Sequence, residues 1–166
     1  IDAVLDGGEC AVGVESTVLD PLLDPPVIYR PGGISRERIE AVVGPVRIAE
    51  KSLGNDKPPE SLESPGLGIR HYAPRAKVVL VESELEMMRA AEGDRVGLML
   101  PDGWKGTEEA VVYRWGPIHH PETLARRLYF GLRWLDEQGV NVIVCPLPAA
   151  AGLGLAVRDR LLKAAK

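Results

Sequence analysis

Apolar strand patterns and amphipathic helix patterns alternate along residues 76–166, and this alternation constrains the fold more than any other feature. The strongest helix pattern covers residues 121–138, where leucines recur at spacings of 4, 4 and 3 residues. Pro121 opens this segment and Gly139 follows it, as is typical of helix boundaries. Strands are expected over residues 77–81, 95–100, 110–113 and 140–145, and further helices over 83–92 and 155–165. Such alternation predicts a mostly parallel, three-layer α/β domain of the Rossmann-like type.

A segment rich in proline and glycine precedes this domain. Residues 51–74 contain Pro58-Pro59, Ser64-Pro65-Gly66 and Pro74, with few apolar residues and no sustained period. Because proline fixes its own φ and biases the preceding residue toward extended backbone, we expect a semi-extended linker. The predicted organisation is residues 1–46 as one part, 47–75 as linker and 76–166 as the Rossmann-like domain.

The first part of the chain predicts a hairpin and a short helix. Residues 13–20 and 26–30 have strand patterns, with a proline-containing turn between them. Ser35 is a good N-cap for a helix that Gly44-Pro45 ends. Its apolar stripe consists of Ile39, Val42 and Val43. This is too little chain to close a core, so we expect these residues to be the end of a larger domain.

Composition limits the functions that fit the chain. The net charge is −4, which argues against global electrostatic capture of nucleic acid and leaves only a local basic patch open. The two cysteines are far apart, which excludes a disulfide framework and indicates a reducing, cytoplasmic location. No apolar run approaches the roughly 20 residues that cross a bilayer. The sequence starts at Ile1 without a secretory signal pattern, so we expect a processed protein or part of a longer one.

The segment Arg30-Pro31-Gly32-Gly33 is a candidate anion site. A guanidinium at a strand end, glycines that permit close backbone approach and a helix start can together bind phosphate. A surface arginine beside an ordinary turn is the alternative. Ser16 and Thr17 offer adjacent hydroxyls for a small polar ligand, such as an amino acid or a phosphate, although threonine also simply suits a strand. The Gly-x-Ser-x-Gly pattern is missing around Ser16, so an activated nucleophile is not supported.

The end of the linker, residues 70–74, combines basic and aromatic residues that could cover a nucleotide. His71 and Tyr72 could stack or hydrogen-bond there, or Tyr72 could anchor the linker to a domain surface. His119-His120 lacks further metal ligands, so we expect His120 to cap a helix. The Gly152-Leu153-Gly154 segment lacks the third glycine of a dinucleotide loop, and a tight turn is expected.

Four blocks in this order carry a family resemblance: DGG, GVESTVLD, VIYRPGGIS and SPGLGIRHYAP. Together they resemble the threonylcarbamoyl-AMP synthase family in its two-domain form, over essentially the whole chain. In that family a linker joins a YrdC-like twisted-sheet catalytic domain to a smaller Rossmann-like domain. The resemblance therefore implies that residues 1–46 are the tail of a YrdC-like domain.

The resemblance implies an enzyme that makes L-threonylcarbamoyl adenylate and pyrophosphate from L-threonine, bicarbonate (or CO2) and ATP, normally with Mg²⁺. The product serves threonylcarbamoyladenosine modification of tRNA, so the tRNA threonylcarbamoyl-transfer machinery is the implied partner. Ser16, and with lower rank Thr17, match L-threonine contacts. The implied nucleotide contacts are Arg30, Gly32, Gly33, His71 and Tyr72. The family is also linked to double-stranded RNA binding, which the acidic first part does not independently support.

Two blocks of the family pattern, Lys-x-Arg and Ser-x-Asn, lie N-terminal to everything in this sequence. We therefore expect the 166-residue chain alone to be inactive and its second domain to act as a lid or scaffold. The alternative hypothesis is a non-catalytic nucleotide- or RNA-binding Rossmann-like module, for which Arg126, Arg127 and Arg133 on one helix are candidates. A purely structural role is the third.

Overall fold

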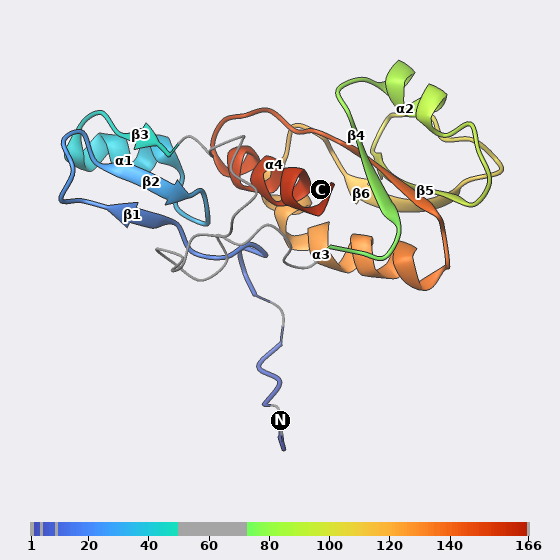
Figure 1. The fold of residues 1–166 in the computed structure, drawn as a ribbon, viewed down its shortest axis with the longest axis horizontal. Coiled ribbons are helices and arrows are strands. Elements are labelled where there is room, and N and C mark those ends of the chain that lie inside the picture. The colour runs from blue at the N-terminus through green and yellow to red at the C-terminus, as the bar shows by residue number, and fades with distance from the viewer. Residues whose placement is uncertain (1, 4, 9, 50–72, 166) are drawn as a thin grey trace, which may run out of the picture.

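The computed structural model describes residues 2–3, 5–8, 10–49 and 73–165, which form two sheets (Figure 1). The strands are Val18–Asp20 (β1), Val27–Arg30 (β2), Arg47–Ile48 (β3), Lys77–Val81 (β4), Val96–Pro101 (β5), Val111–Gly116 (β6) and Val142–Pro146 (β7). The helices are Arg36–Val43 (α1), Glu84–Ala90 (α2), Pro121–Glu137 (α3) and Leu153–Ala164 (α4). We call residues 10–49 the N-terminal unit and residues 73–165 the C-terminal unit.

The N-terminal unit contains the predicted hairpin, with β1 antiparallel to β2. The first strand is shorter than the predicted 13–20 because residues 13–17 leave the sheet. Gly13 has a φ of +79°, and a Cβ there would lie 2.6 Å from the Ala125 carbonyl oxygen of α3. The chain therefore bends against the C-terminal unit before it enters β1.

Helix α1 has the predicted boundaries. The Ser35 Oγ accepts a hydrogen bond from the Arg38 N–H at 3.4 Å, and Gly44 caps the other end with a φ of +80°. No residue of α1 is buried, and Val42 remains 84% exposed. Val42 and Val43 of the apolar stripe are thus exposed, whereas Ile39 is partly buried.

Two residues of the predicted linker belong to the first sheet. Arg47 and Ile48 form β3, which pairs in parallel with β2, so the boundary predicted at residue 46 falls short of the sheet's last strand. A strand of two residues has no periodicity of its own, so no sequence pattern predicts it. Residues 50–72 lie outside the described part of the chain, and the predicted domain division stays a prediction.

The C-terminal unit is the predicted α/β domain. All neighbours in the order β4-β7-β5-β6 are parallel. Alternate residues of β5 face opposite sides: Leu98 and Leu100 pack with Met87 of α2, whereas Met99 packs with α3 and α4. The sheet is therefore covered on both faces, which confirms the three layers (Figure 1).

The main core lies between the sheet and helices α3 and α4. The four leucines of the predicted stripe are buried: Leu124, Leu128, Leu132 and Leu135. Burial of each such side chain contributes about 2 kcal/mol. Trp115 in β6 is fully buried, and its indole N–H donates to the Leu124 carbonyl at 2.9 Å. This bond ties the sheet to the first turns of α3. Within the described residues, no helix has the length and apolar character needed to cross a membrane.

Candidate functional site

Ser16 and Arg30, predicted as separate ligand contacts, lie together. The Arg30 Nε donates to the Ser16 carbonyl at 3.2 Å, and its Nη2 lies 3.3 Å from the Ser16 hydroxyl. Ser16 is exposed and Arg30 is half-buried. A guanidinium beside a hydroxyl can contact an anionic or zwitterionic ligand.

Gly32 and Gly33 bring the turn after β2 against residues 15–17. A Cβ on Gly32 would overlap the backbone of this segment. It would lie 2.3 Å from the Ser16 carbonyl carbon and 2.4 Å from both the Glu15 carbonyl oxygen and the Thr17 nitrogen. The Gly33 N–H donates to the Glu15 carbonyl at 2.9 Å. The two glycines therefore hold two backbone segments together. The predicted contacts of Gly32 and Gly33 with a nucleotide stay a prediction.

The Thr17 hydroxyl forms hydrogen bonds with backbone groups of Ile34. It donates to the Ile34 carbonyl at 2.6 Å and accepts from the Ile34 N–H at 3.1 Å. These two bonds fix the segment next to the start of α1. The predicted contacts of Thr17 with L-threonine stay a prediction, and His71 and Tyr72 lie outside the described residues.

Glu15 is a contact between the two units that was not among the predicted site residues. Its Oε2 accepts from the Arg160 Nε at 2.8 Å and from the Tyr129 hydroxyl at 3.1 Å, across 145 and 114 residues of sequence. Burial pushes the pKa of Glu15 upward, but hydrogen bonds and the charge of Arg160 outweigh burial, so the pKa lies below the ordinary 4.5. Burial and the Glu15 charge raise the pKa of Tyr129, which keeps its hydroxyl protonated as a donor. The available signal was a carboxylate placed directly before two hydroxyl residues.

Glu15 is one end of a buried charge network. The Arg160 Nη1 also contacts the Asp159 Oδ2 at 2.6 Å, and the Lys163 Nζ contacts the same oxygen at 3.0 Å. Asp159, Arg160 and Lys163 are 6–7% exposed. Burial alone would lower the pKa of Arg160, but the neighbouring Glu15 and Asp159 raise it. Among the described residues, the network contains two acidic groups, Glu15 and Asp159, and two basic groups, Arg160 and Lys163.

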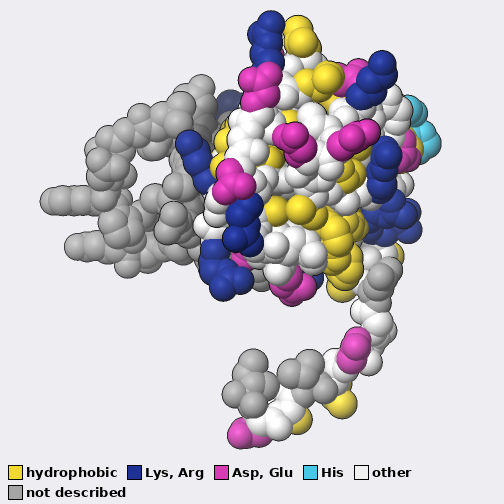
Figure 2. Space-filling model, turned by 90° about the vertical axis from the view of Figure 1, so that its right-hand side faces the viewer, with side chains coloured by type: hydrophobic (Ala, Val, Ile, Leu, Met, Phe, Trp, Pro, Cys, Tyr) yellow, Lys and Arg dark blue, Asp and Glu magenta, His cyan; other side chains and the backbone are white. Residues whose placement is uncertain are grey.

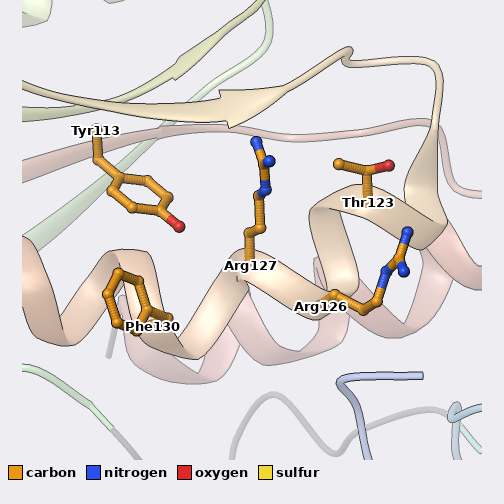
Figure 3. A pocket seen from close by; sticks show the side chains of 5 residues that line it. All are labelled: Tyr113, Thr123, Arg126, Arg127 and Phe130. Carbon is orange, nitrogen blue, oxygen red and sulfur yellow. The ribbon is translucent and has the colours of Figure 1, made fainter. Parts of the chain in front are cut away.

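A cavity of about 480 Å³ opens between β6 and α3 (Figure 3). It is lined by Tyr113, Thr123, Arg126, Arg127 and Phe130. In Figure 3, Tyr113 extends from β6 toward the helix, and Arg127 extends from the helix toward β6. Neither Arg126 nor Arg127 has a hydrogen-bond or ion-pair partner within the described residues. Arg133, the third predicted arginine, does not line this cavity.

The remaining candidates have structural explanations. Among the described residues, no group of three or more His, Cys, Asp or Glu side chains could hold a metal. His120 occupies the N-cap position of α3, as predicted, but its side chain makes no capping hydrogen bond. Gly154 packs against the Ala149 carbonyl, which agrees with a tight turn. Burial raises the pKa of the Cys145 thiol and so disfavours its reactive thiolate.

Comparison with known proteins addresses the family directly. The model of the family described as "Threonylcarbamoyl-AMP synthase, C-terminal domain" matches residues 34–166. The chain belongs to this family. The fold and the order of sequence blocks agree with that membership.

Relatives extend the similarity to the whole chain. Threonylcarbamoyl-AMP synthase from Pyrococcus abyssi is 39% identical over 174 residues, covering 99% of this chain and 49% of the relative. The protein of the same name from Bacillus subtilis is 40% identical over 174 residues, with the same two coverages of 99% and 49%. The crystal structure of P. abyssi Sua5 complexed with L-threonine aligns with a TM-score of 0.83 and 38% identity, covering 96% of this chain and 48% of that one. The chain thus spans about half the length of the curated relatives that it matches.

Proposed function

We propose that this chain is part of an L-threonylcarbamoyladenylate synthase that acts in tRNA modification. The observation that carries the proposal is the Ser16–Arg30 pair, a hydroxyl and a guanidinium whose Oγ and Nη2 lie 3.3 Å apart in a member of this family. The name of one similar structure supports L-threonine as a ligand, because that protein was crystallised with it. The tRNA threonylcarbamoyl-transfer machinery is the proposed recipient of the product.

The proposed chemistry joins three substrates. The amine of L-threonine forms a carbamate, with release of water from bicarbonate or of a proton when CO2 is the donor. A carbamate oxygen then attacks the α-phosphorus of ATP. The bond from that phosphorus to the bridging oxygen breaks, and pyrophosphate leaves with the bond's electron pair. We assign Ser16 to hold L-threonine and Arg30 to hold negative phosphate oxygens. Both groups act by positioning and charge neutralisation rather than by covalent catalysis.

Several parts of this proposal rest on the resemblance alone. Mg²⁺ would accompany ATP and neutralise phosphate charge, and no group among the described residues is assigned as its ligand. His71 and Tyr72 would cover the nucleotide. Since the curated relatives are about twice as long, we expect the 166-residue chain by itself not to make the adenylate.

The test is pyrophosphate release from ATP by the full-length protein that contains this chain. Release should require both L-threonine and bicarbonate. Arg30→Ala should lower kcat/KM by about 100-fold, because a preorganised charge contact to the reacting phosphates is lost. Arg36→Ala is the matched control, since Arg36 is an exposed arginine that pairs with Glu40 on α1. Release that does not depend on L-threonine, or an unchanged Arg30→Ala variant, would contradict the proposal.

A second candidate function is phosphate-ligand binding by the C-terminal unit. The cavity beside α3 favours it, because Arg126 and Arg127 lack partners in the described part of the chain and lie beside the rings of Tyr113 and Phe130. A guanidinium suits a phosphate group, and the rings suit a nucleobase. RNA binding has less support: on the face in Figure 2, Lys and Arg side chains alternate with Asp and Glu side chains rather than forming a continuous basic surface.

Calorimetric titration of ATP into the 166-residue chain would test this second function. Binding that weakens in Arg127→Gln but not in Arg133→Gln would support the cavity, because both arginines lie on α3 and only Arg127 lines it. Binding lost in Arg30→Ala instead would assign the nucleotide to the first site. No measurable binding would argue against the module hypothesis.

A further inference from the structure

Segment 14–17 carries Ser16, yet it lies outside both sheets. Its residues precede β1 and make no ladder hydrogen bonds there. Its position therefore depends on individual contacts. From within the N-terminal unit, the Gly33 N–H binds the Glu15 carbonyl, and the Thr17 hydroxyl binds Ile34.

A further anchor comes from the C-terminal unit. The Glu15 side chain reaches the Arg160 Nε at 2.8 Å and the Tyr129 hydroxyl at 3.1 Å. Arg160 is itself fixed, because its side chain is 6% exposed and also bonds Asp159. Charge-assisted hydrogen bonds of this length are the stronger and more directional class.

Glu15 is thus held on two sides. Its backbone oxygen is bound to the turn after β2, and its carboxylate is bound to α3 and α4. The next residue, Ser16, accepts the Arg30 guanidinium through its carbonyl at 3.2 Å. A rotation of the Glu15 side chain away from its partners would remove the restraint that the C-terminal unit places on the residue next to Ser16.

We propose that Tyr129 and Arg160 are positioning residues, which act through Glu15 to hold the Ser16 hydroxyl and the Arg30 guanidinium in the arrangement that binds L-threonine and phosphate. This inference rests on the proposed function and gives the C-terminal unit a definite part in it. The C-terminal unit contributes no substrate contact of its own in this account. It sets the geometry of contacts that the N-terminal unit makes.

A second contact between the units provides a matched control for the possibility that the Glu15 network only holds them together. Glu37 is a second carboxylate that joins them, since its Oε1 accepts from the Gly152 N–H at 3.2 Å. Glu37 lies on α1 and does not adjoin Ser16. If the network only holds the units together, Glu15→Gln and Glu37→Gln should have similar effects. If it positions Ser16, only Glu15→Gln should change substrate binding.

The experiment measures steady-state kinetics of pyrophosphate release by the full-length protein and its variants, well below their melting temperatures. Tyr129→Phe removes one hydroxyl and should raise KM for L-threonine by about fivefold, the scale of one lost hydrogen bond, while kcat changes by less than about twofold. Glu15→Gln should raise KM at least as much. Arg160→Lys keeps the charge and should recover part of the affinity that Arg160→Met loses. Glu37→Gln should leave KM unchanged.

A double-substitution cycle separates positioning from general destabilisation. In a Ser16→Ala background, Tyr129→Phe should raise KM little further, because the hydroxyl that Tyr129 positions is already gone. Full additivity of the two substitutions, or a lowered melting temperature with unchanged KM, would overturn the inference. If the wild-type protein shows no L-threonine-dependent release, the proposed function fails and the inference fails with it. Normal wild-type kinetics with unaffected network variants would overturn the inference alone.

Discussion

The two units of this chain differ in the interactions that stabilise them. The C-terminal unit buries its apolar residues between a four-stranded sheet and three helices, with Leu128 and Ile143 fully enclosed. The N-terminal unit encloses Val27 and Ile28 but leaves Val42 and Val43 of α1 84% and 49% exposed. One unit is stabilised by its own core. The other depends more on individual polar contacts and on its neighbour.

This difference explains the distribution of the candidate site. The proposed ligand contacts, Ser16 and Arg30, belong to the unit with the smaller core. The groups that restrain them, Tyr129 and Arg160, belong to the unit with the larger core. A rigid scaffold can hold a binding geometry more accurately than a loop can, so the C-terminal unit suits the supporting role.

The largest difference should appear between apolar truncations in the two units. Leu128→Ala removes a fully buried side chain and should lower the free energy of unfolding by about 2–5 kcal/mol, because it leaves a cavity. Val42→Ala removes methyl groups that are largely in water and should change that free energy by less than about 0.5 kcal/mol. Urea denaturation of the 166-residue chain, followed by circular dichroism, measures both. Equal losses would show that α1 is covered in solution.

A smaller effect is expected where backbones touch in the N-terminal unit. Gly32→Ala would place a Cβ against the backbone of segment 15–17, so this segment or the turn must shift. We expect a loss of about 1–3 kcal/mol in stability, the range for overpacking. Gly7→Ala is the matched control, because a Cβ there meets nothing within 4 Å. Urea midpoints of the two variants give the comparison, and a stable Gly32→Ala variant would contradict the observed close approach.

Some features of both units could be predicted from local sequence patterns. The leucine stripe of α3 and the Ser35 cap are local patterns, and the structure confirms both. The proximity of Ser16 and Arg30 was not stated from the sequence, although both residues were selected. It follows from antiparallel pairing of β1 with β2, which brings the ends of the two segments together. The exposure of α1 and the two residues of β3 depend on what other segments cover or pair, and local patterns do not contain that information.

The Glu15 network lay furthest from prediction. Glu15 lies more than 100 residues from its partners Tyr129 and Arg160, and an acidic residue near a strand is ordinarily interpreted as solvated. Asp159, Arg160 and Lys163 likewise resemble the polar face of an exposed helix, yet they are buried on α4. Such residues become informative only when packing brings opposite charges together.

A third prediction concerns the pH dependence of the contact between the units. The pKa of Glu15 is lowered on folding, so the unfolded state binds more protons and the contact stabilises the fold above pH 4.5. That contribution should be lost as the pH falls below 4.5 through the folded-state pKa. Unfolding free energies between pH 7 and pH 3 should therefore decline more steeply in the wild type than in Glu15→Gln. Glu37, whose pKa is also lowered by hydrogen bonds, titrates in the same window and remains as background in both proteins. Parallel curves would mean that Glu15 does not keep its ion pair in solution.

The smallest expected effects come from two helix caps that share one chemistry. Ser35 and Ser83 each accept a hydrogen bond from a helical N–H, at 3.4 and 3.2 Å. Replacement of either by alanine removes a cap worth about 1 kcal/mol to its helix. Helix α2 buries Met87 in the core of the C-terminal unit, whereas α1 buries no residue. Ser83→Ala should therefore lower global stability by nearly the full amount, while Ser35→Ala should mainly increase local opening of α1. Amide hydrogen exchange distinguishes the two, because local opening accelerates exchange in α1 without shifting the urea midpoint. A lower urea midpoint in Ser35→Ala would mean that the N-terminal unit unfolds together with the C-terminal core. The two units would then differ in how their side chains pack, but they would unfold as one cooperative unit.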